Sequence, residues 1–490
     1  MAGVNALRNL ASHGNNRICS LQRVNLPCVF RKSCGGIRQF RDTAHITNVP
    51  RLSPQEVNTV LRANEFSCDI NITGSVKSYD SNQLPSNSPI EDTRAEARCL
   101  NTNGILIGVF DGHGGAACAQ VVAKRLFNYI SAALLPQDLL HQYASSLESE
   151  NTVAFPLLEN YNDRYDFVHE LKAIYLKSFK EYVGELLDAD GEKSIKAAME
   201  QAFLRLDADL SQEALAEHDG RLDRRTLAVG LSGAVACVAH VDMAAASLHV
   251  ASVGDCQAVL GVHTETGTWA ATKLSVEHNT DNPAEVERIR SEHPSTENDT
   301  VIKSERLLGQ LAPLRAFGDF RYKWSREVLK NIVVTRYGEE ALAPHYYTPP
   351  YLTARPDITY HRLTPRDKFM VIASDGLWDL VSPLQVVRLV GEHMFGKVTL
   401  SPLRLPRKNM KLHEISTLLK QRHEGLNKVP IDRNAATHLI RNALGGTECG
   451  VEHSKISQLL SLSQEVVRLF RDDITVTVVY FDSDYLRHPI

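Results

Sequence analysis

The chain has 490 residues, of which 43% are hydrophobic and 23% charged, so it has enough apolar residues for a large core. Its net charge of −4 gives no indication of a nucleic-acid partner. The nine cysteines include no CxxC pair and are odd in number, which argues against a structural zinc site and a disulfide framework. No uninterrupted apolar run is long enough to cross a bilayer, so we expect no membrane span.

The first 50 residues are predicted to be a mitochondrial transit peptide. Residues 1–41 contain seven Lys or Arg and no Asp or Glu, and they lack the continuous apolar stretch of a secretory signal. A disordered basic tail has the same composition and is the alternative. Helix-start signals follow at Ser53 and Pro54. We therefore expect cleavage before about Leu52 and a single domain over residues 51–484.

Residues 53–100 predict a short helix, then irregular structure rich in Ser and Asn, and then a strand. Two adjacent acids, Glu91 and Asp92, lie just ahead of that strand. Neighbouring acids on a surface commonly serve only solvation, so this pair alone does not indicate a site.

The stretch Ile105–Gly115, ILIGVFDGHGG, predicts a buried strand that ends in a polar, glycine-rich turn before a helix. Asp111 lies where the strand ends, and the glycines after it let the backbone turn and approach a ligand closely. A carboxylate beside a bare carbonyl and a histidine suits a hard cation, which prefers oxygen ligands. The alternative is an ordinary strand–turn–helix in which Asp111 is a turn or N-cap residue.

Downstream, the chain is expected to alternate helical and strand-rich blocks. Residues 136–200 predict mostly helices, and residues 232–275 predict antiparallel hairpins. Pro283 is expected to start a charged helix. Residues 325–356 are rich in Pro and Tyr and are expected to form a surface loop, whereas residues 383–470 predict several helices.

Three further strand borders carry acids. Asp255 follows the apolar run of SVGDCQ, Asp375 follows the strand in KFMVIASDGLWD, and Asp472 with Asp473 precedes the strand in RDDITVTVVYF. Aspartates brought to one end of a sheet repel one another, and bound cations relieve that repulsion. The pattern therefore predicts metal ions, and oxygen-only ligands favour magnesium or manganese over zinc.

In this order, the motifs FDGHGG, SVGDCQ, RAFGD, SDGLWD and RDDIT resemble those of the metal-dependent protein serine/threonine phosphatases (PPM, type 2C). The resemblance implies an α+β fold, a central antiparallel β-sandwich flanked by helices, with two Mg²⁺ or Mn²⁺ ions at one end and a third, weaker metal site. It also implies in-line attack on phosphorus by a water that bridges two metals, without a phospho-enzyme. Cys118 and Cys256 have no evident base beside them and are expected to be packing residues.

The match implies metal-binding roles for seven positions: Asp111 as the bridge between both metals, the Gly112 carbonyl at the second metal, Asp375 and Asp472 at the first, Glu91 and Asp92 on metal-bound water, and Asp255, with Asp375, at the third. His113 resembles the general acid, a role that suits histidine because its pKa lies near working pH. The catalytic residues implied by the resemblance are thus Asp111 and His113.

Two positions depart from the family pattern. Asn87 occupies a position where the family commonly has an arginine that grips the phosphate. An amide is a weaker, neutral partner than a guanidinium, so phosphate binding at Asn87 is expected to be weak and the enzyme to depend more on its metals. GDCQ replaces the usual GDSR but keeps its acid, so little loss is expected there.

Within the family, the stretches SNSPIED, AATHLIRNALG, HYYTPPYLTARP and DKFMVIASDGLWD resemble the mitochondrial pyruvate dehydrogenase phosphatases, as do long helical inserts near residues 131–200, 320–356 and 395–465. This implies dephosphorylation and reactivation of the pyruvate dehydrogenase E1α subunit in the mitochondrial matrix. It also implies docking on the lipoyl domain of the acetyltransferase (E2) core and a regulatory subunit as a further partner. The alternatives are another matrix phosphoprotein as substrate, or a phosphatase-like binding module without catalysis. The second is disfavoured because every acidic ligand position is filled.

Overall fold

The computed structural model describes residues 51–148, 155–162, 167–188, 194–218, 220–404 and 410–488. The predicted transit peptide at residues 1–50 lies outside these residues, so both the targeting role and the cleavage position stay predictions. No helix in the described part of the chain is long and apolar enough to cross a membrane.

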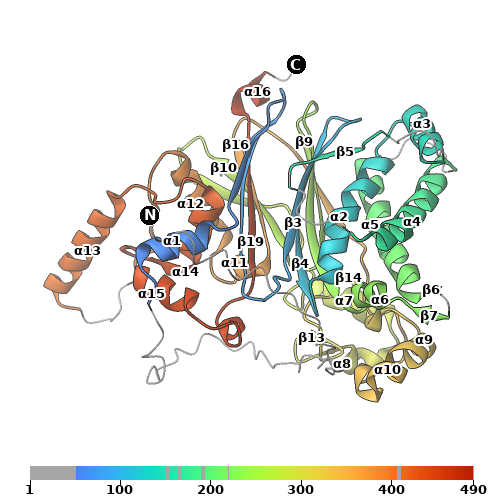
Figure 1. Ribbon diagram of the computed structural model, residues 1–490. Coiled ribbons are helices and arrows are strands. Elements are labelled where there is room, and N and C mark those ends of the chain that lie inside the picture. The colour runs from blue at the N-terminus through green and yellow to red at the C-terminus, as the bar shows by residue number, and fades with distance from the viewer. Residues whose placement is uncertain are drawn as a thin grey trace, which may run out of the picture. The chain divides into compact units, whose positions relative to one another are not determined.

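Two antiparallel sheets lie face to face at the centre of the domain (Figure 1), which confirms the predicted sandwich. The first sheet has six strands, in the spatial order β1 (Phe66–Asp69), β2 (Val76–Leu84), β19 (Ile474–Phe481), β16 (Asp367–Ala373), β10 (Gln257–His263) and β11 (Trp269–Lys273). The second has the order β15 (Asp357–Arg362), β9 (Ser247–Val253), β8 (Gly233–Asp242), β4 (Gly104–His113), β3 (Thr93–Cys99) and β5 (Leu158–Asn160), with β14 (Phe317–Gly318) also paired to β8.

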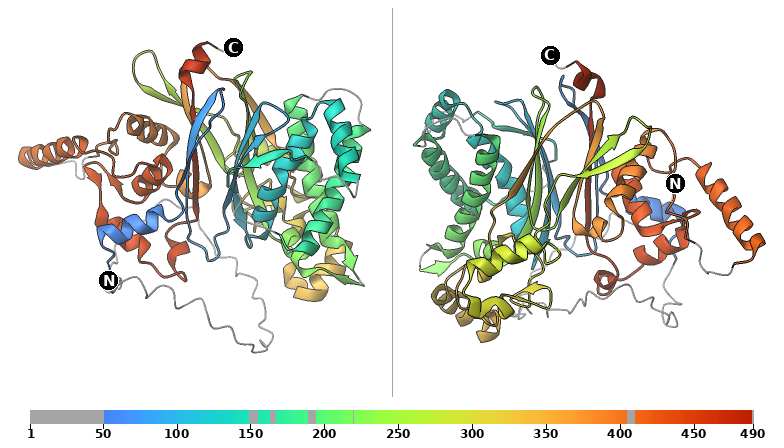
Figure 2. Two further views of the ribbon diagram at one scale, coloured as in Figure 1. Left: turned by 45° about the horizontal axis from the view of Figure 1, so that its top comes forward. Right: turned by 180° about the vertical axis from the view of Figure 1, so that it is seen from behind.

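Helices cover the outer face of each sheet (Figures 1 and 2). The second sheet carries α2 (Ala117–Ala133), which packs on β3, β4 and β8, and around it α3 (Gln137–Glu148), α4 (His169–Leu187), α5 (Ile195–Leu215) and α6 (Arg224–Leu231). The first sheet carries α12 (Pro383–Met394) and α14 (Ala435–Gly445), with α1 (Pro54–Arg62), α15 (His453–Leu460) and the outlying α13 (Leu412–Leu426) beyond them. The helices expected within residues 136–200 and 383–470 are thus present.

Shorter elements connect these layers. They are the helices α7 (Pro283–Glu292), α8 (Asn298–Val301), α9 (Arg326–Leu329), α10 (Thr335–Tyr337), α11 (Asp375–Trp378) and α16 (Ser483–Arg487), and the strand pairs β6–β7 (Glu217–His218, Arg221–Leu222), β12–β13 (Ile302–Lys303, Arg306–Leu307) and β17–β18 (Gly446–Thr447, Gly450–Val451).

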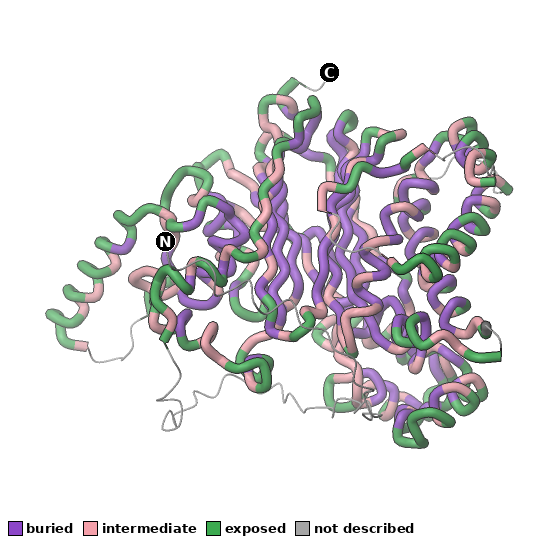
Figure 3. Tube along the Cα trace, in the orientation of Figure 1, coloured by how far each residue is buried: buried purple, intermediate pink, exposed green. Residues whose placement is uncertain are grey.

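Local sequence explains where several elements begin. Ser53 caps α1 in a reciprocal capping box with Glu56: the Ser53 hydroxyl accepts the Glu56 N–H at 3.3 Å, and the Glu56 carboxylate accepts the Ser53 N–H at 2.8 Å. Asn282 caps α7 directly before Pro283, as expected for a proline in the first turn. Within β4, the run Ile105–Phe110 is buried, and the central strands of both sheets are buried along most of their length (Figure 3).

The segment after α1 is not irregular, contrary to the prediction, because it forms β1 and β2. Ser81 and Asn82 are fully buried in β2, and the Asn82 amide donates to the Leu61 carbonyl at 2.7 Å and to the Thr437 hydroxyl at 2.8 Å. These partners come from α1 and α14. Residues of distant helices therefore supply the hydrogen-bond partners that buried polar side chains of β2 require. The polar composition of this segment, taken alone, suggests a loop.

Residues 325–356 are likewise more than the expected surface loop. They include α9 and α10, and Tyr346 and Tyr351 are both buried. The Tyr346 hydroxyl donates to the Trp324 carbonyl at 2.6 Å, and the Tyr351 hydroxyl donates to the Glu297 carboxylate. These two tyrosines therefore anchor the segment to the body of the domain.

His240 gives the domain a pH-dependent stability that does not involve the acidic residues named above. Its side chain is buried, and neither ring nitrogen has a hydrogen-bond partner among the described residues. Burial, reinforced by the neighbouring His249 and opposed by Asp242, lowers the pKa of His240 to about 4. The unfolded ring takes up its proton near pH 6.5, so stability falls as the pH drops from there towards 4.

We expect His240→Leu to remove part of this acid sensitivity. Relative to wild type, the variant should lose roughly 2 kcal/mol less stability between pH 7 and pH 5, measured by urea unfolding at both values. His413→Leu, on the exposed face of α13, is the control and should follow wild type. Parallel pH curves for wild type and His240→Leu would contradict the assignment.

Candidate active site

Acids from both sheets gather around Asp111, as the sequence predicts. Asp111 ends the apolar run of β4, and burial raises its pKa well above the usual value, reinforced by the charges of Asp92, Asp375, Asp255 and Asp472. These four come from the residue before β3, the start of α11, the β9–β10 crossover and the residue pair before β19. The carboxylates of both sheets therefore lie within strong electrostatic reach of one another. Asp111 is not a helix cap, because α2 begins after Ala116.

The crossover at Asp255 differs from a simple hairpin. Strand β9 belongs to the second sheet and β10 to the first, so SVGDCQ carries the chain from one sheet to the other. Burial raises the pKa of Asp255, and the charge of Asp379 adds to this rise, while Asp255 and Asp379 both raise the pKa of Asp375. Asp255 and Asp375 thus lie within electrostatic reach of one another, and the third metal site stays a prediction. Asp379 is an additional acid at this end, and its place in SDGLWD is the signal for it.

Glu91 and Asp92 are tied into the site by short hydrogen bonds. The Asp92 carboxylate is buried and accepts the Ser374 hydroxyl at 2.8 Å, and burial together with the charge of Asp473 raises its pKa to about 7. The Glu91 carboxylate accepts the Gly115 N–H at 2.7 Å, which links it to the turn after β4. The segment SNSPIED, residues 86–92, therefore reaches both the Asp111 turn and the Asp375 turn.

Asp473 holds the SNSPIED segment, residues 86–92, in place. Its Oδ1 accepts the backbone N–H groups of Ser86 and Asn87, and its Oδ2 accepts the backbone N–H of Glu91 at 2.9 Å and the Asn87 side-chain amide at 2.7 Å. This corrects the expected role of Asn87, whose Nδ2 holds Asp473 rather than facing a phosphate. The sequence shows the paired acids of RDDIT but gives no signal for the structural role of the second.

Glycines allow the site loops to touch. A Cβ on Gly112 would lie 2.5 Å from the Glu91 carbonyl oxygen and 3.0 Å from the Ala119 Cβ. A Cβ on Gly376, next to Asp375, would overlap the Asp473 carbonyl oxygen. Both positions therefore require glycine for close backbone approach.

His113 is paired with Asp319, a partner that the sequence did not identify. Strand β8 pairs with β4 on one side and with β14 on the other, and this brings the His113 Nε2 against the Asp319 Oδ2. Burial favours the neutral ring, but the Asp319 carboxylate outweighs it and raises the pKa of His113. Asp319 thus orients His113 and stabilises its protonated form. The motif RAFGD was its signal in the sequence.

Arg468 is a second group that sequence reasoning missed. Its guanidinium lies between two acids of the site, 2.9 Å from Glu91 Oε2 and 3.1 Å from Asp472 Oδ1. The motifs give no signal for it, because it lies outside them in a 3₁₀ turn, Val467–Leu469, that precedes RDDIT.

The donor set fits hard divalent cations. In the described part of the chain, no group of three or more His, Cys, Asp or Glu side chains is arranged so that it could hold a metal ion. The acids instead crowd together with raised pKa values, which marks a site where cations would relieve mutual repulsion. All candidate ligands are oxygens, as Mg²⁺ and Mn²⁺ prefer. Cys118 and Cys256 are buried with raised thiol pKa values, in agreement with their expected packing role.

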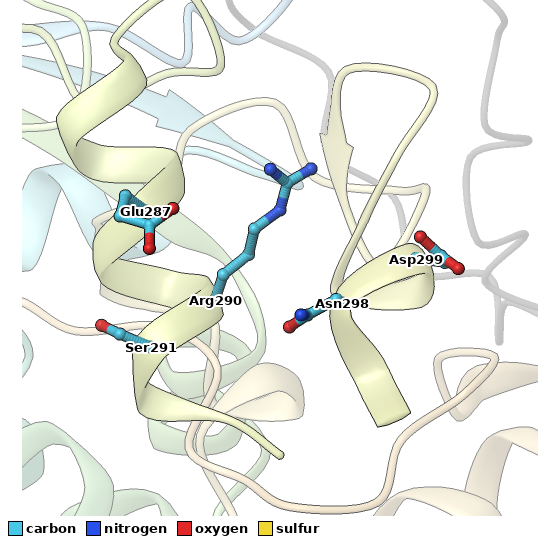
Figure 4. A pocket seen from close by; sticks show the side chains of 5 residues that line it. All are labelled: Glu287, Arg290, Ser291, Asn298 and Asp299. Atoms are coloured by element: carbon cyan, nitrogen blue, oxygen red, sulfur yellow. The ribbon is translucent and has the colours of Figure 1, made fainter. Parts of the chain in front are cut away.

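A separate hollow of about 390 Å³ lies between α7 and α8 (Figure 4). It is lined by Glu287, Arg290, Ser291, Asn298 and Asp299. None of the predicted site residues lines it, so the chemistry is not placed there.

Comparisons with known proteins identify the family of the chain. The sequence model of the family described as "Protein phosphatase 2C" matches residues 140–411 of this chain. The chain belongs to the protein phosphatase 2C family.

Among curated proteins, the chain is 45% identical over 452 residues to [pyruvate dehydrogenase [acetyl-transferring]]-phosphatase 1, mitochondrial, of Bos taurus, an alignment that covers 88% of this chain and 83% of the relative. It is 42% identical over 480 residues to phosphatase 2 of the same name in Homo sapiens, covering 94% and 90%. Among solved structures, a phosphatase from a pathogenic strain of Toxoplasma gondii aligns over 84% of this chain and 94% of its own, with a TM-score of 0.43 and 15% identity.

Proposed function

We propose that the protein is a metal-dependent protein serine/threonine phosphatase that dephosphorylates and reactivates the E1α subunit of the pyruvate dehydrogenase complex. The observation that carries the chemistry is the partly buried gathering of carboxylates around Asp111, beside the His113–Asp319 pair. The observation that favours the substrate is the similarity, over most of the chain, to two relatives named for pyruvate dehydrogenase.

Two Mg²⁺ or Mn²⁺ ions would be held by Asp111, the Gly112 carbonyl, Asp375 and Asp472, with Glu91 and Asp92 on metal-bound water and Asp255 with Asp375 at a third site. When bound, such ions neutralise phosphate charge and acidify a water that can attack phosphorus in line. The chain's own contribution is orientation and proton transfer. His113 donates a proton to the departing serine oxygen, and Asp319 holds the ring and favours its protonated form.

The proposed location is the mitochondrial matrix. Both relatives are mitochondrial by name, and residues 1–41 have the acid-free, basic composition of a transit peptide. The proposed partners are the lipoyl domain of the acetyltransferase core and a regulatory subunit. Import of the full chain into isolated mitochondria, followed by protease protection and shortening, tests the location.

Metal removal tests the chemistry. After chelation, the protein should not hydrolyse a phosphoserine peptide, and Mg²⁺ or Mn²⁺ should restore turnover. Absence of turnover at every metal concentration would instead support a binding module without catalysis.

Phosphorylated E1α, compared with an unrelated matrix phosphoprotein at equal concentration, tests the substrate. We expect a clear preference for E1α in kcat/KM, because the substrate is selected by surfaces outside the metal site. Equal rates would favour another substrate while leaving the phosphatase assignment intact.

A further inference from the structure

Arg468 places a positive charge at the edge of the acidic site. One guanidinium nitrogen lies 2.9 Å from Glu91 Oε2, and the other lies 3.1 and 3.3 Å from the two carboxylate oxygens of Asp472. The Arg468 side chain is 47% exposed, against 15% for Glu91 and 23% for Asp472. The guanidinium therefore covers the solvent side of these acids, where an incoming phosphate has to arrive.

The amide at position 87 is not available for the same task. The Asn87 Nδ2 donates to Asp473 Oδ2 at 2.7 Å, and the Asp473 carboxylate is buried. Releasing this amide would leave a buried carboxylate short of a hydrogen bond, which is costly. A cation for the phosphate has to come from another segment.

The turn that carries Arg468 is fixed by its neighbours. Val467 is buried, and its carbonyl accepts the N–H groups of Phe470 at 2.9 Å and Arg471 at 3.1 Å. The Arg471 guanidinium points the other way and donates to the Pro85 carbonyl at 2.7 Å. Arg471 therefore anchors the turn to the loop after β2, and Arg468 is held at the site.

We propose that Arg468 binds the phosphate of the substrate. This inference rests on the proposed phosphatase function and deepens it. The planar guanidinium presents paired N–H donors that match two phosphate oxygens. Asp472 is also a predicted metal ligand, and Glu91 is predicted to hold metal-bound water. Once bound cations neutralise the charge of Glu91 and Asp472, the Arg468 guanidinium exchanges a carboxylate oxygen for a phosphate oxygen. The same side chain is therefore a countercharge in the metal-free protein and a phosphate ligand in the metal-bound protein.

The test compares Arg468→Ala and Arg468→Lys with Arg366→Ala, whose guanidinium pairs with the exposed Glu265 near the β10–β11 turn. Titration calorimetry with inorganic phosphate, in saturating Mn²⁺, measures binding without turnover. We expect the dissociation constant for phosphate to rise at least tenfold in Arg468→Ala, to recover partly in Arg468→Lys and to stay unchanged in Arg366→Ala. With a phosphoserine peptide, KM should rise more than kcat falls.

Unchanged phosphate affinity, with only the Mn²⁺ titration or the metal-free melting temperature shifted, would overturn the proposal and leave Arg468 as a countercharge alone. Arg468→Lys keeps the positive charge and serves as the deciding variant where Arg468→Ala fails to fold. Absence of turnover in the wild-type protein would defeat the proposed function, whereas the calorimetric comparison judges Arg468 separately.

Discussion

Asp111→Asn is expected to abolish phosphatase activity while leaving the fold intact. Burial and the charges of four neighbouring aspartates raise the pKa of Asp111. Asp111 therefore lies among the negative charges that would hold the cations. An amide of the same shape fills the same space but supplies no charge. Losing one preorganised electrostatic contact of this kind lowers turnover by roughly 10²–10³-fold, and a bridging position belongs at the upper end of that range.

The stability of the metal-free protein separates this effect from misfolding. Because Asn removes one of several repelling carboxylates, the metal-free melting temperature should be equal to or higher than that of wild type. Mn²⁺ binding, followed by calorimetry, should weaken in parallel with turnover. Asp484→Asn is a control, since Asp484 is exposed and its ion pair is with Arg487, three residues away. Wild-type turnover in Asp111→Asn would refute the bridging assignment.

The acidic site could be predicted from sequence because its signals are local. In each case an acid borders a buried apolar run and has a glycine or a second acid beside it, as in Ile105–Gly112 and Lys368–Gly376. A few residues are enough to predict where a strand ends. Acids at four strand borders in one chain therefore predict that these acids meet at one end of the sheets. The ordered motifs then predicted the sandwich, and the two sheets confirm it.

The parts that could not be predicted depend on pairing between distant segments. His113 meets Asp319 only because β8 lies between β4 and β14, and a strand order of this kind leaves no trace in any single window of sequence. Asp473 and Arg468 contact Glu91 in the SNSPIED segment, more than 370 residues earlier in the chain. The buried polar strand β2 was missed for the same reason, since its partners come from α1 and α14.

Gly233→Ala is expected to disable the general acid without unfolding the protein. Gly233 is the first residue of β8. It lies opposite His113 of β4 on one side and opposite Gly318 of β14 on the other. A Cβ built on Gly233 would overlap both the His113 Nε2 and the Asp319 Oδ2. These atoms are the ends of side chains rather than backbone, so the substitution displaces the pair instead of the strands.

The leaving group makes this prediction specific. Loss of a general acid costs roughly 10²–10⁴-fold when the departing oxygen needs a proton, as serine does. p-Nitrophenolate leaves without being protonated. Gly233→Ala should therefore lose far less activity on p-nitrophenyl phosphate than on a phosphoserine peptide. His113→Ala should show the same contrast. Gly184→Ala in α4, whose added Cβ meets no atom within 4 Å, is the control and should match wild type on both substrates. An equal loss on both substrates would mean that Gly233 supports the metal site or the fold rather than the proton donor, because the metals serve either leaving group alike.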